Sequence, residues 1–139
     1  MTPMMAAALL LSAPALKDMR KPTRLHLGEW AVERLEFNGH AIEPTTGLSL
    51  WITADSVTLL RNGLRTSSES AAFFEAIRGK AEVDFYPGDA KKQRMGIWKL
   101  EENTLTICEA GRGVDRPTEF SALEGSRRSM WVLKRVPRE

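Results

Sequence analysis

Two alternating runs in the last third of this chain constrain its fold more than any other feature. They form the segment GIWKLEENTLTICEA at residues 96–110, in which a polar Glu-Asn pair separates the two halves. Residues two apart in a strand share a face, so antiparallel pairing across that turn sets Leu100 opposite Leu105 and Trp98 opposite Ile107. The segment therefore predicts a β-hairpin with one continuous apolar face, which further strands must cover.

Similar alternation predicts strands elsewhere in the chain. Asn-Gly pairs at residues 38–39 and 62–63 supply the tight turns that hairpins favour. The first strand changes phase after Val32, which indicates a β-bulge. Besides the hairpin, the expected strands lie at residues 30–37, 48–53, 57–59 and 81–86, around Phe120, and at 130–135.

This pattern predicts an all-β protein with a single antiparallel barrel of about eight strands. A sheet of this size usually curls, and closing it into a barrel removes the exposed edges that would otherwise pair with other chains. An eight-stranded barrel has room inside for side chains or for one small ligand. We expect residues 25–136 to form this domain.

The segment at residues 65–80 is compatible with two structures. Ser68 is a suitable N-cap for a helix that Gly79 would end. Phe73 and Ile77 also lie on one face of a period-2 pattern, which favours a strand. Taken alone, the residues favour a helix for positions 68–78, with a strand as the alternative.

Charge and cysteine content exclude several classes of protein. Among the 139 residues, 20 are basic and 18 acidic, and a net charge of +2 gives no electrostatic reason to expect nucleic acid or an anionic membrane as partner. The single cysteine, Cys108, excludes an intramolecular disulfide, and we interpret it as a buried strand residue.

The N-terminal segment differs in composition from the rest of the chain. Residues 1–15 are apolar and end on Ala-Pro-Ala, which resembles a signal-peptidase site although no basic residue precedes the apolar stretch. We expect a signal peptide there, or else a short N-terminal helix, followed by a basic lead-in at residues 16–24. The stretch is too short for a transmembrane span. Export to the periplasm or outside the cell is the expected localisation, with the cytoplasm as the alternative.

The sequence contains no arrangement of residues typical of an enzyme or a metal site. His26 and His40 are the only histidines, neither has other ligands at metal-binding spacing, and we expect both at the surface or in turns. The loop PGDAKK lacks the spacing of a phosphate-binding loop, and the serines near Ser68 lack a neighbouring base. We therefore predict no catalytic residue, no metal and no cofactor.

Four segments of the chain resemble a known family. Gly28-x-Trp30, GIWKLEENTLTIC, DRPTEFSA and the terminal VLKR are similar, in that order, to an uncharacterised lipocalin-like family abundant in planctomycete bacteria. The resemblance runs from about Leu25 to Arg135. It implies a small antiparallel barrel, often behind an export signal, and favours a strand for residues 65–80. It implies no known activity.

The wider resemblance to lipocalins also implies how the barrel closes. In lipocalins a Gly-x-Trp motif on the first strand places the indole at the closed end, where an arginine from the last strand packs across it. Here the resemblance assigns those roles to Gly28, Trp30 and Arg135, with Arg128 as the alternative arginine. Glu119 is expected to tie its loop to the barrel, against Arg116 or a backbone amide.

The apolar residues suggest a function without specifying a ligand. Aromatic side chains could fill the barrel completely or line a cavity, and the sequence leaves both open. We predict a non-catalytic domain that binds a small hydrophobic molecule inside the barrel. The alternative is a ligand-free module with a solid core that binds an unknown protein partner. The residues expected to line a cavity are Trp98, Leu100, Leu105, Ile107, Trp30 and Phe85.

Overall fold

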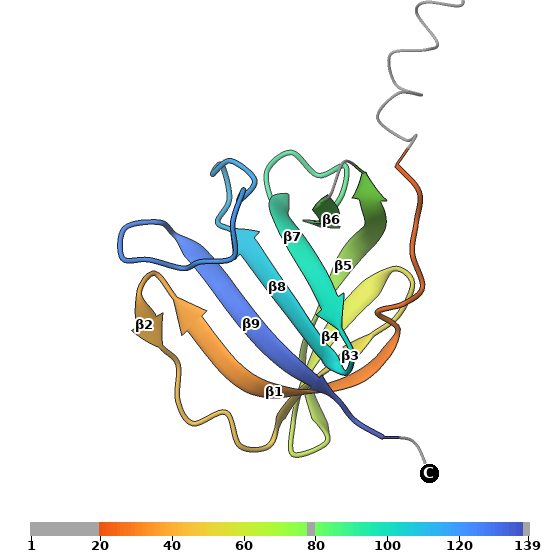
Figure 1. Cartoon of the computed structure of the whole chain (residues 1–139). Helices are drawn as coiled ribbons and strands as arrows, with labels where there is room; N and C mark the ends of the chain where they lie inside the picture. The colour runs from red at the N-terminus through yellow and green to blue at the C-terminus, as the bar shows by residue number, and fades with distance from the viewer. Residues whose placement is uncertain (1–19, 78–79, 138–139) are drawn as a thin grey trace, which may run out of the picture.

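The computed structural model describes residues 20–77 and 80–137, and within these ranges every regular element is a β-strand (Figure 1). No helix occurs in the described ranges, so none there is long and apolar enough to cross a membrane. The strands are β1 (Gly28–Phe37), β2 (His40–Ala41), β3 (Leu48–Ile52), β4 (Ser56–Arg61), β5 (Leu64–Ile77), β6 (Lys80–Phe85), β7 (Arg94–Glu101), β8 (Thr104–Ala110) and β9 (Arg128–Arg135).

The strands form one antiparallel sheet that closes on itself. Consecutive strands from β3 to β9 pair in order, and β1 pairs with both β3 and β9. β2 is a two-residue strand attached to the end of β1, so the barrel consists of β1 and β3 to β9. This closed barrel of eight antiparallel strands confirms the predicted fold class.

The turns and the bulge lie where the sequence places them. Asn38 and Asn62 have φ angles of 52°, and the glycines after them have φ angles of 87° and 82°. Two successive positive φ angles define the turn that best continues the twist of a hairpin. The pairing of β1 with β9 shifts register between Val32 and Arg34, which confirms the predicted bulge.

Residues 65–77 are part of strand β5, not of a helix. β5 pairs with β4 over its first half and with β6 over its second half. Ala71 and Phe73 are buried while Ala72 and Phe74 are half-buried, which is the alternation of a strand. The local helix signals are overridden because β4 and β6 each need a partner at this position to close the sheet.

The lead-in before β1 lies along β5. The Thr23 amide donates to the Phe73 carbonyl at 3.2 Å, and the Glu75 amide donates to the Lys21 carbonyl at 2.7 Å. These bonds cover the second half of the β5 edge, where β4 has ended. The signal peptide or helix predicted for residues 1–15 lies outside the described residues.

The strand predicted around Phe120 is wrong. Residues 111–127 form an irregular loop between β8 and β9. The reason is that β8 already pairs with β7 on one edge and with β9 on the other, so it has no free edge for another strand. The loop is held on the outside of the barrel by side chains, chiefly Arg116 and the buried Pro117.

One half of the barrel interior is closely packed. Its side chains have at most 6% of their surface exposed and come from six different strands. Trp98 also donates through its indole nitrogen to the carbonyls of Phe74 and Glu82, at 3.2 and 3.1 Å, next to an irregularity in the pairing of β5 with β6. The residues of this filled half are Trp30, Phe73, Val83, Trp98, Leu105 and Leu133.

Candidate binding site

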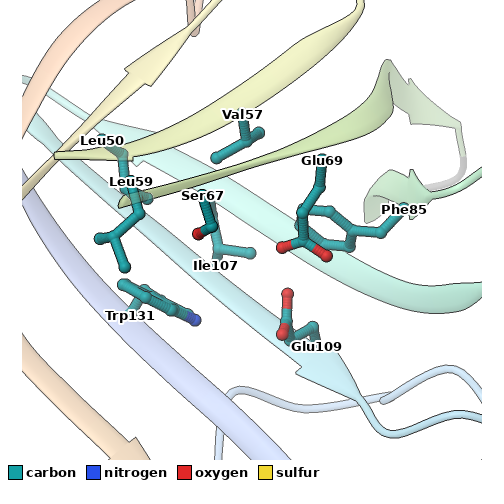
Figure 2. A pocket seen from close by; sticks show the side chains of 9 residues that line it. All are labelled: Leu50, Val57, Leu59, Ser67, Glu69, Phe85, Ile107, Glu109 and Trp131. Carbon is teal, nitrogen blue, oxygen red and sulfur yellow. The ribbon is translucent and has the colours of Figure 1, made fainter. Parts of the chain in front are cut away.

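The other half of the interior contains a cavity of about 110 Å³. Six of its lining side chains are apolar, two are glutamates and one is a serine, as Figure 2 shows. The lining residues come from β3, β4, β5, β6, β8 and β9, so the cavity lies within the barrel and not on its surface. They are Leu50, Val57, Leu59, Ser67, Glu69, Phe85, Ile107, Glu109 and Trp131.

Strand periodicity explains why two carboxylates point into the barrel. Along β8, Leu105, Ile107 and Glu109 share the inner face, and the first and last of them are separated by roughly 13 Å at the rise of a strand. The inner face thus runs from the filled half through the cavity wall to a carboxylate. Glu69 reaches the same space from β5, where Ala71 marks the inner face.

The two carboxylates share one arginine. Arg94 Nη2 lies 2.7 Å from Glu69 Oε2 and 3.5 Å from Glu109 Oε1. Figure 2 shows the two carboxylates pointing toward each other across the cavity. The guanidinium also lies over the ring of Phe85, 5.0 Å from its centroid, which is the geometry of a cation–π contact.

Burial changes the protonation of this cluster. Desolvation raises the pKa of Glu109 to about 7, and the positive charge of Arg94 opposes this shift only in part. The pKa of Arg94 is raised by Glu109 and Glu69, although desolvation works against the shift. Near neutral pH, therefore, Glu109 exchanges between a carboxylate that accepts hydrogen bonds and an acid that can donate one.

The structure places the six predicted lining residues in different parts of the interior. Phe85 and Ile107 line the cavity, whereas Trp30, Trp98 and Leu105 belong to the filled half. The sixth, Leu100, is partly buried and packs against the same core. Filled core and cavity therefore coexist in one barrel, each occupying its own half.

The polar part of the site was missed from the sequence. Glu109 continues the inner-face alternation of the hairpin by one step beyond Ile107, so the alternation alone indicates its inward position. Glu69 lies in the segment that could also have been a helix, which hid its inward position. Trp131 alternates with Leu133 in β9 and faces Ile107 across the strand pair.

The closed end contains the contact that the lipocalin resemblance implies. The guanidinium of Arg135 lies 4.2 Å from the centroid of the Trp30 ring and donates to the carbonyls of Leu25 and Leu27, at 2.9 and 3.1 Å. Gly28 has a φ of 122°, which other residues rarely adopt, and its Cα faces Arg135. These residues close the barrel and do not line the cavity.

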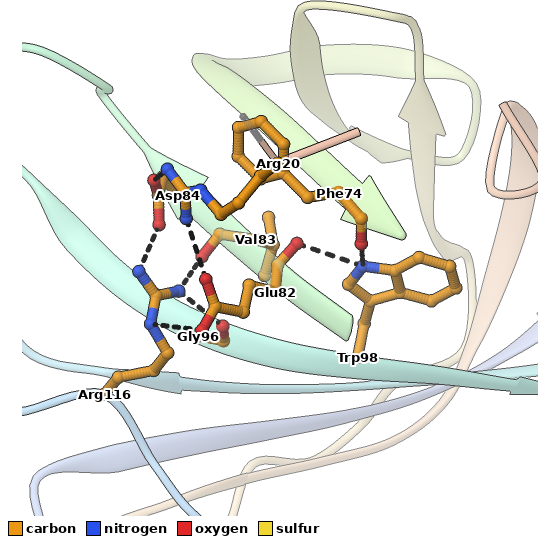
Figure 3. Close-up of polar contacts among 8 residues, drawn as sticks. All are labelled: Arg20, Phe74, Glu82, Val83, Asp84, Gly96, Trp98 and Arg116. Atoms are coloured by element: carbon orange, nitrogen blue, oxygen red, sulfur yellow. Dashed lines mark hydrogen bonds and ion pairs between the residues drawn. The ribbon is translucent and has the colours of Figure 1, made fainter. Parts of the chain in front are cut away.

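Glu119 does not pair with Arg116. Glu119 is exposed and accepts a hydrogen bond from Ser121 at 3.4 Å, a weak local contact. Arg116 instead crosses to β6 and β7, where it forms an ion pair with the buried Asp84 of β6 at 2.7 Å and donates to the Gly96 carbonyl of β7 at 2.9 Å (Figure 3). Arg116 therefore has the loop-to-barrel role that the sequence suggested for Glu119.

The other side of this ion pair is formed by the lead-in. Arg20 donates to Glu82 and to Asp84, both at 2.8 Å, and its guanidinium lies 3.9 Å from the centroid of the Phe74 ring. In Figure 3 both arginines converge on the same two acidic residues of β6. This cluster fixes the loop and the lead-in to the outside of the barrel, and none of its residues lines the cavity.

The two histidines lie in different environments. His40 is exposed in β2, as expected. His26 lies in a turn, which was one of its two expected positions, but it is buried with 1% of its surface exposed and is not a surface residue. It stacks on Phe73 with 4.0 Å between ring centroids, because the chain enters β1 through the closed end. Among the described residues no group of three or more potential metal ligands is present.

Fold and site together define a closed eight-stranded antiparallel barrel with a half-filled interior and a small cavity that ends on two glutamates. No family model, no curated protein and no solved structure matches this chain.

Proposed function

We propose that the protein binds one small, mainly apolar molecule in the cavity of the barrel without converting it chemically. The observation that carries this proposal is the unfilled half of an otherwise closely packed interior. Protein interiors are normally packed without large voids, and six apolar side chains surround this one.

The size of the cavity limits the ligand. An engineered apolar cavity of roughly 150 Å³ holds one benzene molecule, whereas drug-sized ligands occupy about 300–1,000 Å³. With about 110 Å³, this cavity fits a single ring or a short chain. A longer molecule would have to extend out of the cavity into solvent.

Binding of ethylbenzene, followed by NMR of the tryptophan indole N–H groups, tests the proposal. We expect a saturable shift of the Trp131 signal, identified with a Trp131→Phe variant, because Trp131 lines the cavity. Val57→Phe should abolish the shift because the larger ring occupies the space. Leu64→Phe, at a position 74% exposed on β5, is the matched control and should bind like the wild type.

The proposal fails if folded wild-type protein shows no saturable shift of Trp131. It also fails if Val57→Phe, folded by circular dichroism, binds ethylbenzene as well as Leu64→Phe does. Either result would favour the alternative of a ligand-free interaction module.

A further inference from the structure

The cavity has two chemically different ends. Its apolar walls are continuous from Leu50 to Trp131, whereas the carboxylates of Glu69 and Glu109 form the other end (Figure 2). We propose that the ligand is a small cationic amine whose ammonium group binds Glu69 and Glu109 while its apolar body fills the cavity. This inference rests on the proposed function and names the class of ligand for it.

The charges of the cluster are not balanced. Arg94 contributes one positive charge, whereas Glu69 and Glu109 contribute two negative charges when both are ionised. Arg94 lies at hydrogen-bonding distance from Glu69, at 2.7 Å, but 3.5 Å from Glu109. An ionised Glu109 therefore has only a long contact with Arg94 and keeps acceptor capacity at the cavity wall, and a buried carboxylate that is weakly paired is unfavourable.

An ammonium group would complete this arrangement. It supplies three donors and one positive charge, so it brings the cluster to neutrality and adds a closer partner for Glu109 to its long contact with Arg94. An anionic ligand would not fit, because the two carboxylates line the cavity and Arg94 does not. The cavity therefore selects by charge as well as by size.

Exposure indicates how such a ligand would lie. The Glu69 side chain is 28% exposed and that of Glu109 is 13% exposed, so the carboxylate end communicates with solvent. Val57 and Ile107 on the opposing walls are at most 7% exposed. Ser67 is also exposed, so water reaches the lining at more than the carboxylate end, and an ammonium group bound by the two glutamates keeps contact with solvent.

The groups that face Glu109 set the pH dependence of amine binding. These groups are Glu69 on β5, Arg94 on β7, and Ser129, which is the cross-strand neighbour of Glu109 on β9. Tyr86, which follows β6, interacts with Arg94. Alkylamines remain protonated throughout the neutral range. Amine affinity should therefore fall as the pH drops below about 7, because desolvation raises the pKa of Glu109 to about 7 and the acid form no longer attracts a cation.

The test compares three probes of similar size: benzylamine, which is cationic, ethylbenzene, which is neutral, and benzoate, which is anionic. Isothermal titration calorimetry at pH 8 should show benzylamine binding at least about tenfold more tightly than ethylbenzene. Ethylbenzene forms no hydrogen bond, whereas a hydrogen bond between charged groups strengthens binding by about this factor or more. Benzoate should not bind. The Trp131 indole signal locates each probe in the cavity.

Matched variants separate the contribution of the carboxylates. Glu109→Gln should weaken benzylamine binding about tenfold, remove most of its pH dependence, and change ethylbenzene binding much less than benzylamine binding. Glu69→Gln is the second variant and should act in the same direction. Glu119→Gln removes an exposed carboxylate outside the cavity and should leave both affinities at the wild-type value.

The possible failures are distinguishable. If ethylbenzene binds as tightly as benzylamine, or benzoate binds more tightly, the amine inference is overturned while the proposed function stands. If Glu109→Gln and Glu69→Gln both fold and both bind benzylamine like the wild type, the inference is likewise overturned. If none of the probes shifts Trp131, the proposed function itself fails.

Discussion

His26 and Glu109 should make the stability of this barrel respond to pH in opposite directions. Desolvation lowers the pKa of His26 from 6.5 to about 4, because its ring is buried between aromatic side chains and neither ring nitrogen has a partner among the described residues. A histidine with a lowered pKa contributes stability above its unfolded pKa and loses it as the pH falls through the folded pKa. At 1.36 kcal/mol per pKa unit, the loss amounts to about 3 kcal/mol.

Glu109 has the reverse effect. Its pKa rises from 4.5 to about 7, so the folded protein holds a proton that the unfolded chain has already lost. The contribution of Glu109 to stability is complete below pH 4.5 and is lost as the pH rises through about 7. The size is again about 3 kcal/mol.

Between pH 4.5 and 6.5, the pKa values of the two groups in the unfolded chain, His26 and Glu109 change the free energy of unfolding in opposite directions. Over this range the unfolded chain binds an extra proton at His26, and the folded protein binds an extra proton at Glu109. The two slopes cancel in the wild type. In Glu109→Gln only the histidine remains, and the free energy of unfolding should increase with pH by about 1 kcal/mol per unit. In His26→Leu it should decrease with pH by a similar amount.

Urea unfolding at pH 4.5, 5.5 and 6.5, followed by circular dichroism and tryptophan fluorescence, measures these slopes in the pH window that the two shifted groups define. The comparison uses slopes, so a constant stability change caused by either substitution does not matter. The double variant should regain the wild-type slope. Parallel profiles for the wild type and both single variants would refute the assignment of these two groups.

Two further predictions concern how the barrel is held closed. Arg135→Leu should lower the free energy of unfolding by about 2 kcal/mol, because it removes the cation–π contact with Trp30 and the hydrogen bonds to two carbonyls. Arg135→Lys should lower the free energy of unfolding by less. An equally large decrease in Arg128→Leu would contradict the role of Arg135. Arg116→Ala should cost about 2 kcal/mol in urea unfolding, because Asp84 is buried and keeps only Arg20 as a charged partner. Arg112→Ala, an exposed arginine in the same loop, serves as the control, and a similar loss there would argue against the ion pair.

The fold could be predicted from local pattern because a barrel depends on alternation and turns. The hairpin at residues 96–110 and the Asn-Gly turns follow from side-chain period and positive φ angles, which are properties of neighbouring residues. The strand expected at Phe120 failed for a non-local reason. Whether a short apolar stretch forms a strand depends on a free edge, and the pairing of β9 with β8 leaves none.

The candidate site was less accessible to sequence reasoning. Phe85 and Ile107 could be placed on an inner face, but the alternation does not say how far along the barrel the packing is complete. That depends on the sizes of side chains that meet from different strands, such as Trp98 and Phe73 in the filled half. The pairing of Glu69 with Arg94 joins residues of two strands that are not neighbours in the sheet, and no local pattern encodes it.

The pairing of β1 with β9 has a consequence for how this protein folds. The first and last strands of the barrel are neighbours, with Trp30 opposite Arg135 and Phe37 opposite Ser129. During synthesis, every barrel strand from β3 to β8 can pair with the barrel strand before it, but β1 and β8 must both wait as open edges until the last strand arrives. Closure is therefore a long-range event, which makes folding slow for a domain of this size and leaves two edges open to other chains in the meantime.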